Sequence, residues 1–459
     1  MATSRMEAAT TVSPLTVITL GTLRRLLPDN LLQALHAQAP RGRTRKLAIE
    51  SLFWLVVQVA AGARRSVYAA FHADQAAEDS SINVSYQAVY DKLKRMPVEF
   101  DTALVGASGK QALALLEHDD LPTFKGLKKY RIRIIDGTDL GGTEHRLEVL
   151  RKIKAAGLPG RFVVAYDWAT GVCYAAAASE DAYTSERVLV QNILAQADTH
   201  DLFVMDRHYC TTAVFQAISS RQAHFVVREH IGNLRCRELS KPRYLGRVET
   251  GKVSEQKLEV EDTQTGETHL VRRLILRLDT PTEDGETEIQ LVTNLPAKVN
   301  GLRIVELYRE RWTLERHFNF LKNCLQGEVE SLGHPPAAIF MMCLALVTGN
   351  AWAVTQAAIR AEHGGEAEFE KLSGHYVADE LAGNYRAVDR LLVDEWEPIE
   401  SLTAGKFWKW LKHLAQEIRP AAFYKHARGP KLPPPPRRSG RTRHHYSTYR
   451  LLNPTKKIP

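Results

Sequence analysis

The sequence is poor in cysteine and lacks a recognisable targeting or membrane segment. Its five cysteines are scattered over 459 residues, odd in number, and without the close spacing of a zinc site or a disulfide framework. We therefore expect structural thiols in a reducing cytoplasm. No basic-then-apolar signal pattern occurs near the N-terminus, and the apolar runs 47–61 and 337–352 are short or broken by polar residues. Both runs predict buried helices.

The chain has no net positive charge outside its C-terminal end. The chain has 61 Lys and Arg against 53 Asp and Glu, but 11 of the basic residues and none of the acidic ones lie after residue 417, so the remainder carries 50 against 53. Any nucleic-acid contact made by the body must therefore use local basic patches. We expect the Pro-rich, basic tail 419–459 to be disordered, and either to add phosphate contacts or only to aid solubility.

Helical periodicity is strongest towards the two ends of the chain. Residues 1–120 predict a helical region, in which Ser85 caps a helix that extends to about Arg95. Basic residues cluster at 41–46, at 64–65 and at 92–95. Such clusters are usually solvated surface, although the helix 85–95 also fits a DNA major groove. Residues 351–418 predict a second helical region, whose Trp408 and Trp410 we assign to packing.

Between these regions the pattern changes to alternating apolar and polar residues. The segment KKYRIRIIDGTDL predicts a strand that ends at Asp136, and two further runs around Thr170 and Gly171 predict a hairpin. A helix capped by Ser185 follows, and LFVMDRHYC predicts a strand that ends at Asp206. Residues 224–292 have the short alternating segments of a β-rich insert. The order strand, hairpin, helix, strand predicts an α/β fold.

The segment 301–326 predicts one long helix with two different faces. At about 100° per residue, one stripe is apolar and predicts a buried face, formed by Leu307, Leu314, Phe318, Leu321 and Leu325. A second stripe runs for about 20 Å along one side of the helix and carries Tyr308, Arg311, Glu315 and Lys322. The ordinary interpretation of such a stripe is a solvated surface with charge pairs that support the helix. Its length also suits successive phosphates of a nucleic-acid strand.

The spacing of these four polar residues resembles the YREK signature of the insertion-sequence-four family of bacterial DDE transposases. The flanking TNLPAKVNGLRIVELYRERW and LERHFNFLK, and the stretches DGTDL and MDRHYCT, are also similar to that family. The resemblance implies an α/β, ribonuclease H-like mixed sheet over 121–350, interrupted by the β-rich insert. It also implies helical N- and C-terminal regions, of which 1–120 binds DNA ends. His208 departs from the family's usual Gly or Asn, which affects the local loop more than catalysis.

The resemblance further implies that Asp136, Asp206 and Glu315 are the catalytic and metal-binding residues. Carboxylate oxygens are ligands that Mg²⁺ prefers, and two ions about 3.5–4 Å apart activate an attacking oxygen and stabilise a leaving one. We expect Asp136 to bind both ions and the other two acids one each, with Mn²⁺ as a substitute. Either aspartate alone has a structural alternative, the capping of a turn at a strand end. Three neighbouring acids are less well placed for this role: Asp139, Asp201 and Glu310.

By the same resemblance, Tyr308, Arg311 and Lys322 bind phosphates near the cleaved end. Trp312 either stacks on a displaced base or is a buried core residue. The expected substrates are double-stranded DNA, namely the terminal inverted repeats of an insertion sequence and the target DNA to which they are joined. The expected assembly is a homodimer on that DNA, in the cytoplasm at the bacterial nucleoid, with no membrane partner. Two alternatives stay open: a related nuclease without strand transfer, and a non-catalytic DNA-binding protein that kept the fold.

Overall fold

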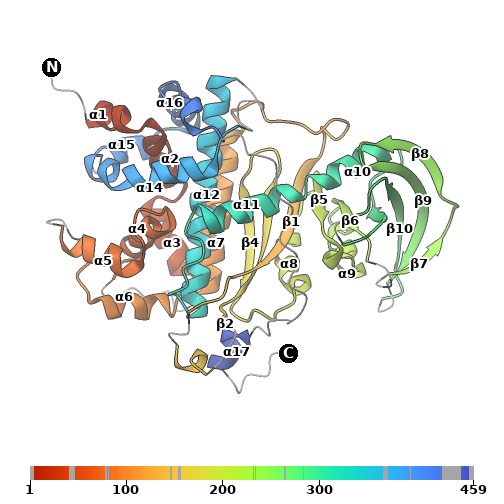
Figure 1. Ribbon diagram of the computed structural model, residues 1–459, viewed down its shortest axis with the longest axis horizontal. Coiled ribbons are helices and arrows are strands. Elements are labelled where there is room, and N and C mark those ends of the chain that lie inside the picture. Colours follow the sequence, from red (N-terminus) through yellow and green to blue (C-terminus); the bar gives the residue numbers. More distant parts are fainter. Residues whose placement is uncertain are drawn as a thin grey trace.

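The computed structural model describes residues 5–40, 47–77, 80, 82–144, 147–152, 157–230, 232, 234–262, 265–282, 284–364, 371–392, 394–425 and 446–453. In these residues a mixed sheet runs through the molecule, with a body of helices at one end and a curved set of strands at the other (Figure 1). The basic cluster predicted at 41–46 lies outside the described residues, and so does most of the C-terminal tail.

Among the described residues, ten strands form one sheet in the order β4-β3-β1-β5-β6-β11-β10-β9-β7, with β8 paired to β9. Pairing is antiparallel from β4 to β1 and parallel from β1 to β6. This order confirms the predicted α/β, ribonuclease H-like fold class. The strands that precede the insert are β1 (Arg131–Asp139), β3 (Arg161–Asp167), β4 (Cys173–Ser179) and β5 (Asp201–Met205), and a short β2 (Gly157–Leu158) lies apart from this sheet.

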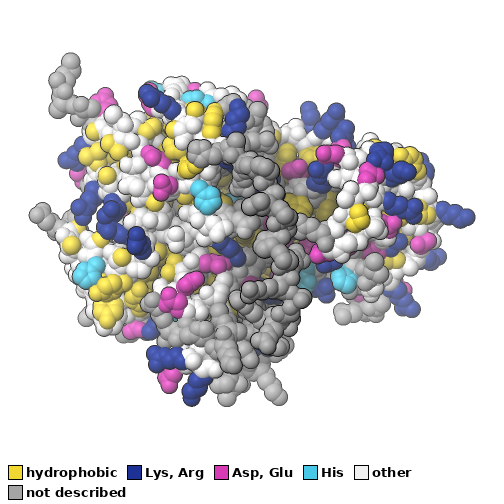
Figure 2. All heavy atoms as spheres, in the orientation of Figure 1, with side chains coloured by type: hydrophobic (Ala, Val, Ile, Leu, Met, Phe, Trp, Pro, Cys, Tyr) yellow, Lys and Arg dark blue, Asp and Glu magenta, His cyan; other side chains and the backbone are white. Residues whose placement is uncertain are grey.

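The residues of the predicted β-rich insert continue this sheet. They form β6 (His224–Arg228), β7 (Arg235–Glu238), β8 (Arg243–Val248), β9 (Gly251–Glu261), β10 (Thr268–Leu278) and β11 (Glu288–Thr293). Apart from β6, which pairs in parallel with β5, they are antiparallel. Basic and acidic side chains are interleaved on the visible face of this end (Figure 2). Ion pairs of the insert include Arg237–Glu259 at 2.6 Å and Arg247–Asp279 at 2.5 Å. The insert therefore does not present a purely basic surface here.

Helices cover both faces of the central strands. On one face lie α8 (Glu186–Leu194), which contacts β3 and β4, and α9 (Thr212–Ser219), which contacts β6. On the other lie α7 (Val98–Leu116) and α12 (Pro335–His363) against β4, and α11 (Trp312–Asn323) against β1. The alternation of side chains along β1 separates the two cores, because Ile134 packs on the side of α11 and Ile135 on the side of α8. The predicted caps Ser85 and Ser185 are both confirmed.

The N-terminal and C-terminal helices share one apolar core. Its remaining helices are α1 (Arg5–Val12), α2 (Pro14–Leu26), α3 (Asp29–Gln38), α4 (Ile49–Ala60), α5 (Val67–Gln75), α6 (Tyr86–Leu93), α14 (Gly374–Leu391), α15 (Trp396–Glu400) and α16 (Ala404–Ala415). Helix α12 passes through this core. The predicted boundary between the ribonuclease H-like region 121–350 and the helical region 351–418 lies inside this helix. By length and composition α12 is apolar enough to cross a membrane, but its most apolar window is entirely buried in the protein. The prediction of a buried helix is confirmed.

The prediction of one unbroken helix over 301–326 is wrong. The structure has α10 (Gly301–Arg309) and α11, with a tight turn between them. At this turn the amides of Glu310, Arg311 and Thr313 each donate to the carbonyl three residues earlier instead of four. The predicted apolar stripe is nevertheless buried throughout, from Leu307 to Leu325. The helical spacing of the apolar stripe is therefore kept across the turn, because the turn has nearly helical backbone angles.

Part of the predicted disordered tail has defined structure. Residues 420–423 form a short 3-10 helix, β12 (Tyr446–Ser447) pairs in parallel with β2, and α17 (Thr448–Leu452) follows. The Ser447 hydroxyl accepts a hydrogen bond from the Ala182 amide, and Arg450 lies 2.6 Å from Asp181, whose side chain is 2% exposed. The tail is thus attached to the segment between β4 and α8 through a buried carboxylate.

We predict that Arg450→Ala lowers the free energy of unfolding by about 1–3 kcal/mol, because it removes a charged partner from a buried acceptor. The control Arg235→Ala removes an ion pair with Glu261 in which both side chains are largely exposed, and should cost less than about 1 kcal/mol. Urea denaturation measures both changes. Hydrogen exchange of residues 446–452 should increase in the Arg450 variant only; equal effects of the two variants would contradict the anchoring role.

Candidate active site

Asp136 lies on β1, and Asp206 comes directly after the adjacent parallel strand β5. Strand β1 pairs with β5 up to the residues immediately before the two aspartates, and neighbouring strands are about 4.8 Å apart. By alternation, both aspartates share the face of Ile134 and Val204, which α11 covers. The prediction that the strand ends at Asp136 is wrong in detail, because β1 continues to Asp139. After β5 ends, β3 still pairs with β1 and maintains the strand.

Arg311, in the turn before α11, connects the first aspartate with Glu315. Its Nη1 donates to Asp136 Oδ2 at 3.0 Å, and its Nη2 lies 2.6 Å from Glu315 Oε1. Asp206 makes no ion pair within the described residues, and its Oδ1 accepts the Arg207 amide at 2.6 Å. The structure therefore brings Asp136 and Glu315 into one ion-paired group through Arg311, and Asp206 follows on the neighbouring strand.

The acidic group carries more negative charge than Arg311 balances. Burial raises the pKa of Asp136 to about 7, against the opposing effects of Arg311 and of the Gly137 amide. The negative charges of Glu315 and Asp206 raise this pKa further. A second cation close to the three carboxylates would therefore stabilise the ionised form of Asp136.

The three acids suit a hard divalent cation in ligand type, since all offer carboxylate oxygens. However, no group of three His, Cys, Asp or Glu side chains in the described part of the chain has a geometry that holds a metal ion. Asp136 and Glu315 each give an oxygen to Arg311 instead. The ligand types thus fit a divalent cation, which would compete with the guanidinium for these oxygens.

The other predicted DNA-binding residues differ in their accessibility. Trp312 is 60% exposed, so the alternative interpretation of Trp312 as a buried core residue is wrong. Tyr308 is half-buried against the core beneath α10. Lys322 donates to the Asp139 carbonyl at 3.1 Å and pairs with Glu328 at 2.8 Å. Of these three side chains, only Trp312 is freely presented to a ligand.

The neighbouring acids have structural partners. These contacts are Asp139 with Arg161 at 2.7 Å, Asp201 with Arg131 at 3.0 Å and Arg133 at 3.2 Å, and Glu310 with the Trp168 indole at 3.0 Å. Each of the three acids therefore accepts a hydrogen bond or ion pair from a side chain other than Arg311.

A fourth acid near the site was missed by the sequence reasoning. Glu186, at the start of α8, accepts a hydrogen bond from the buried Tyr209 hydroxyl at 3.0 Å. Its carboxylate lies directly over Gly137, where an added Cβ would come within 2.1 Å of it. The glycine after Asp136 was the available sequence signal, since it permits this close approach. Glu186 is thus packed against the strand that carries Asp136.

Comparison with known protein families gives one finding for the middle of the chain. Residues 127–348 match the family model described as the transposase DDE domain. This range contains both aspartates, Glu315 and Arg311. A search of curated proteins finds no match. The family match supports a DDE transposase, and hence DNA as the substrate.

We predict that Gly137→Ala lowers the free energy of unfolding by about 1–3 kcal/mol, because the new methyl group must displace Glu186 from the Tyr209 hydroxyl. As a control, Gly106→Ala adds a methyl group to α7 where no atom lies within 4 Å, and should stabilise by about 0.5–1 kcal/mol. Chemical denaturation measures both. The double variant Gly137→Ala with Glu186→Ala should lose less free energy of unfolding than the two single variants together. Strictly additive losses would contradict the close approach of Glu186 to Gly137.

The raised pKa of Asp136 predicts a pH-dependent stability of the metal-free protein. The ordinary value is 3.8 and the folded value about 7, so the folded state binds this proton more tightly than the unfolded state does. Its contribution to stability is complete below pH 3.8 and is lost as the pH rises through about 7. Thermal unfolding in chelator should therefore show that Asp136→Asn is increasingly stabilising, relative to wild type, between pH 4 and 8. A stability difference between Asp136→Asn and wild type that does not change with pH would contradict the raised pKa of Asp136. The control is Asp279→Asn, which alters an exposed ion pair.

Proposed function

We propose, with the transposase DDE domain match as premise, that this protein cleaves DNA at the ends of an insertion sequence and joins those ends to target DNA. The proposal rests on one observation above all. Asp136 and Asp206 are adjacent on parallel strands, beneath a helix whose Glu315 shares Arg311 with Asp136. We further propose that the chain is a member of the insertion-sequence-four group, on the YREK spacing.

Both reactions require an activated oxygen nucleophile and stabilisation of the leaving oxygen. We assign Asp136, Asp206 and Glu315 as ligands of two Mg²⁺ ions, with Mn²⁺ as a substitute; when bound, such ions supply this electrostatic stabilisation. The chain's own contribution is to hold the carboxylates in place. Two of them come from rigid neighbouring strands and the third from a helix packed on those strands, which limits their relative motion.

We assign the contacts with the cleaved DNA end to Tyr308, Arg311, Trp312 and Lys322. Arg311 and Lys322 now pair with carboxylates, so binding a phosphate requires each to exchange one anionic partner for another. The planar guanidinium suits two parallel hydrogen bonds to phosphate, while the ammonium group acts as a point charge. The exposed ring of Trp312 suits stacking on an unpaired base.

Recognition of the element's ends is assigned to the helical region 1–120. Its candidate DNA-binding helix is α6, with Lys94 and Arg95 immediately after it. The catalytic region is 121–350, with the insert at about 224–292, and a helical region 351–418 and the basic tail 419–459 follow. We propose a homodimer on double-stranded DNA, acting in the bacterial cytoplasm at the nucleoid.

One observation favours a second candidate, a non-catalytic DNA-binding protein with the same fold. In the described residues the three acids do not form a metal-binding geometry, and Arg311 neutralises two of them. Tight binding of DNA ends without any metal-dependent cleavage would support this alternative. A nuclease without strand transfer would instead cleave and fail to join.

We predict that Asp136→Asn, Asp206→Asn and Glu315→Gln each reduce DNA cleavage at least about a hundredfold, since each removes a proposed metal ligand. The substrate is DNA that carries the terminal repeats flanking the gene, assayed with Mg²⁺, with Mn²⁺ and with chelator. The matched control is Glu310→Gln, on the same helical segment but bonded to Trp168, which should retain activity.

Strand transfer is followed in the same reaction by adding a supercoiled target plasmid. Joined products that depend on all three acids would support the transposase. Cleavage that is unaffected by Asp136→Asn or Glu315→Gln would refute the assignment of the site. Cleavage without joining would favour the nuclease.

A further inference from the structure

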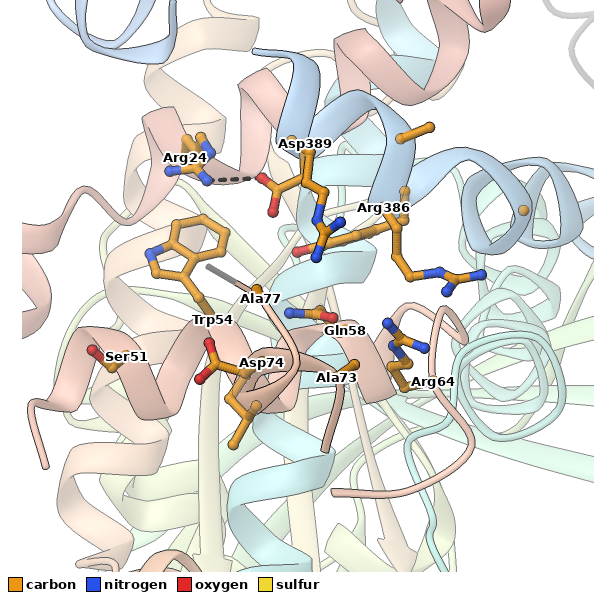
Figure 3. Close-up of a pocket in the computed structure, with 15 residues that line it drawn as sticks. Arg24, Ser51, Trp54, Gln58, Arg64, Ala73, Asp74, Ala77, Arg386 and Asp389 are labelled. Atoms are coloured by element: carbon orange, nitrogen blue, oxygen red, sulfur yellow. Dashed lines mark hydrogen bonds and ion pairs between the residues drawn. The ribbon is translucent and has the colours of Figure 1, made fainter. Parts of the chain in front are cut away.

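A second site with unbalanced charge lies in the helical body, apart from the acidic group. It is a cavity of about 590 Å³ among α2, α4, α5 and α14, shown in Figure 3. Four arginines line it: Arg24, Arg64, Arg386 and Arg390. In the close-up, Arg64 and Arg386 extend into one side of the pocket, while Trp54 and Asp74 lie on the other. Residues from both ends of the sequence therefore build this pocket.

Only one of the four arginines is neutralised. Arg24 pairs with Asp389 at 2.8 Å, and its guanidinium lies 4.4 Å from the centre of the Trp54 ring. The other acid of the lining, Asp74, accepts a hydrogen bond from the Ser80 hydroxyl at 2.6 Å. Within the part of the chain that the structure describes, the remaining three arginines make no ion pair. The pocket therefore carries an excess of positive charge.

Arg64 gives the strongest indication that the pocket binds an anion. Its Nε is buried and has no hydrogen-bond partner. Burial lowers the pKa of Arg64, and the positive charges of Arg386 and Arg390 lower it further. The guanidinium as a whole is only partly buried, so the cost is that of one buried N–H donor without a partner, to which the like charges of exposed Arg386 and Arg390 add. An anion bound between these side chains would relieve both.

We propose that this pocket binds a phosphate ester of nucleotide size. Its phosphate would be held by Arg64, Arg386 and Arg390, and its organic part would lie against Trp54 and Leu55. Four arginines against two aspartates leave the lining with two excess positive charges, which favour a doubly charged phosphate over a single carboxylate, and the planar guanidinium donors match phosphate oxygens. The volume exceeds the needs of inorganic phosphate and falls within the range of organic ligand sites. The half-buried indole carries the Arg24 guanidinium over its ring and offers its remaining apolar surface to a base.

The same chemistry has two sources, a free nucleotide and the terminal phosphate of a DNA strand. Isothermal titration distinguishes them with four probes: inorganic phosphate, deoxyadenosine monophosphate, and a short single-stranded oligonucleotide with and without a terminal phosphate. The full-length protein is used in chelator, so the result is independent of the proposed cleavage chemistry. Because phosphate contacts weaken with salt, each titration is repeated at two salt concentrations.

We expect one of the phosphate-ester probes to bind more tightly than inorganic phosphate. Arg64→Gln and Arg386→Gln should each weaken that binding about tenfold or more, through loss of a charge-assisted contact. Lys409→Gln, on the exposed side of α16, is the matched control and should bind like wild type. Thermal unfolding checks that each variant is folded, and Arg386, being exposed, is the variant least expected to disturb folding.

Preference for the free nucleotide, or for the oligonucleotide with a terminal phosphate, would each support the site and identify its source. Binding of inorganic phosphate as tightly as of either ester would overturn the nucleotide-sized ligand. Absence of binding to all probes, or equal binding by the two arginine variants and the Lys409 variant, would overturn the site itself.

Discussion

The region that matches the transposase DDE domain holds like charges close together where water is partly excluded. Asp136 is half-buried beside Glu315 and near Asp206, and its burial together with these neighbours raises its pKa to about 7. Arg311 offsets part of this cost through two ion pairs, and it is itself only 9% exposed. Removing Arg311 would leave the carboxylates of Asp136 and Glu315 without their cationic partner, whereas removing one of the acids would relieve repulsion between like charges. The same arrangement leaves a negative excess that a divalent cation or a change of protonation can relieve.

The surrounding structure places these charges through ordinary packing. The pairing of β1 with β5 ends just before Asp136 and Asp206, so these residues are neighbours, and β3 continues to pair with β1 beyond that point. The turn between α10 and α11 sets the start of α11 at Arg311, while the buried leucines on both sides keep the two helices on one core. On the opposite side, Glu186 lies over Gly137 and is held by Tyr209. The acidic group is therefore positioned by strands and helices whose packing is stabilised by apolar contacts of their own.

The helical body has a different electrostatic character. There the excess is positive, at Arg64, Arg386 and Arg390, and it lies between helices from opposite ends of the sequence. Helix α12 joins the two halves, since it packs both on β4 and within the helical core. A ligand in the pocket would thus contact the N-terminal and C-terminal helices together. Such a ligand would stabilise the packing on which α12 depends, by binding the folded state alone.

Periodicity in the sequence was enough to predict the strands, the hairpin, the caps Ser85 and Ser185 and the apolar stripe, because these patterns depend on residues close along the chain. The tertiary structure alone decided the rest. A period of 3.6 residues cannot reveal the tight turn before α11, since the turn keeps nearly helical angles. No local pattern pairs Arg311 with Asp136, 175 positions away, or sets Glu186 over Gly137. Those contacts exist only because the sheet and its helices bring distant segments together, and burial then gives their charges a strength that exposed residues lack.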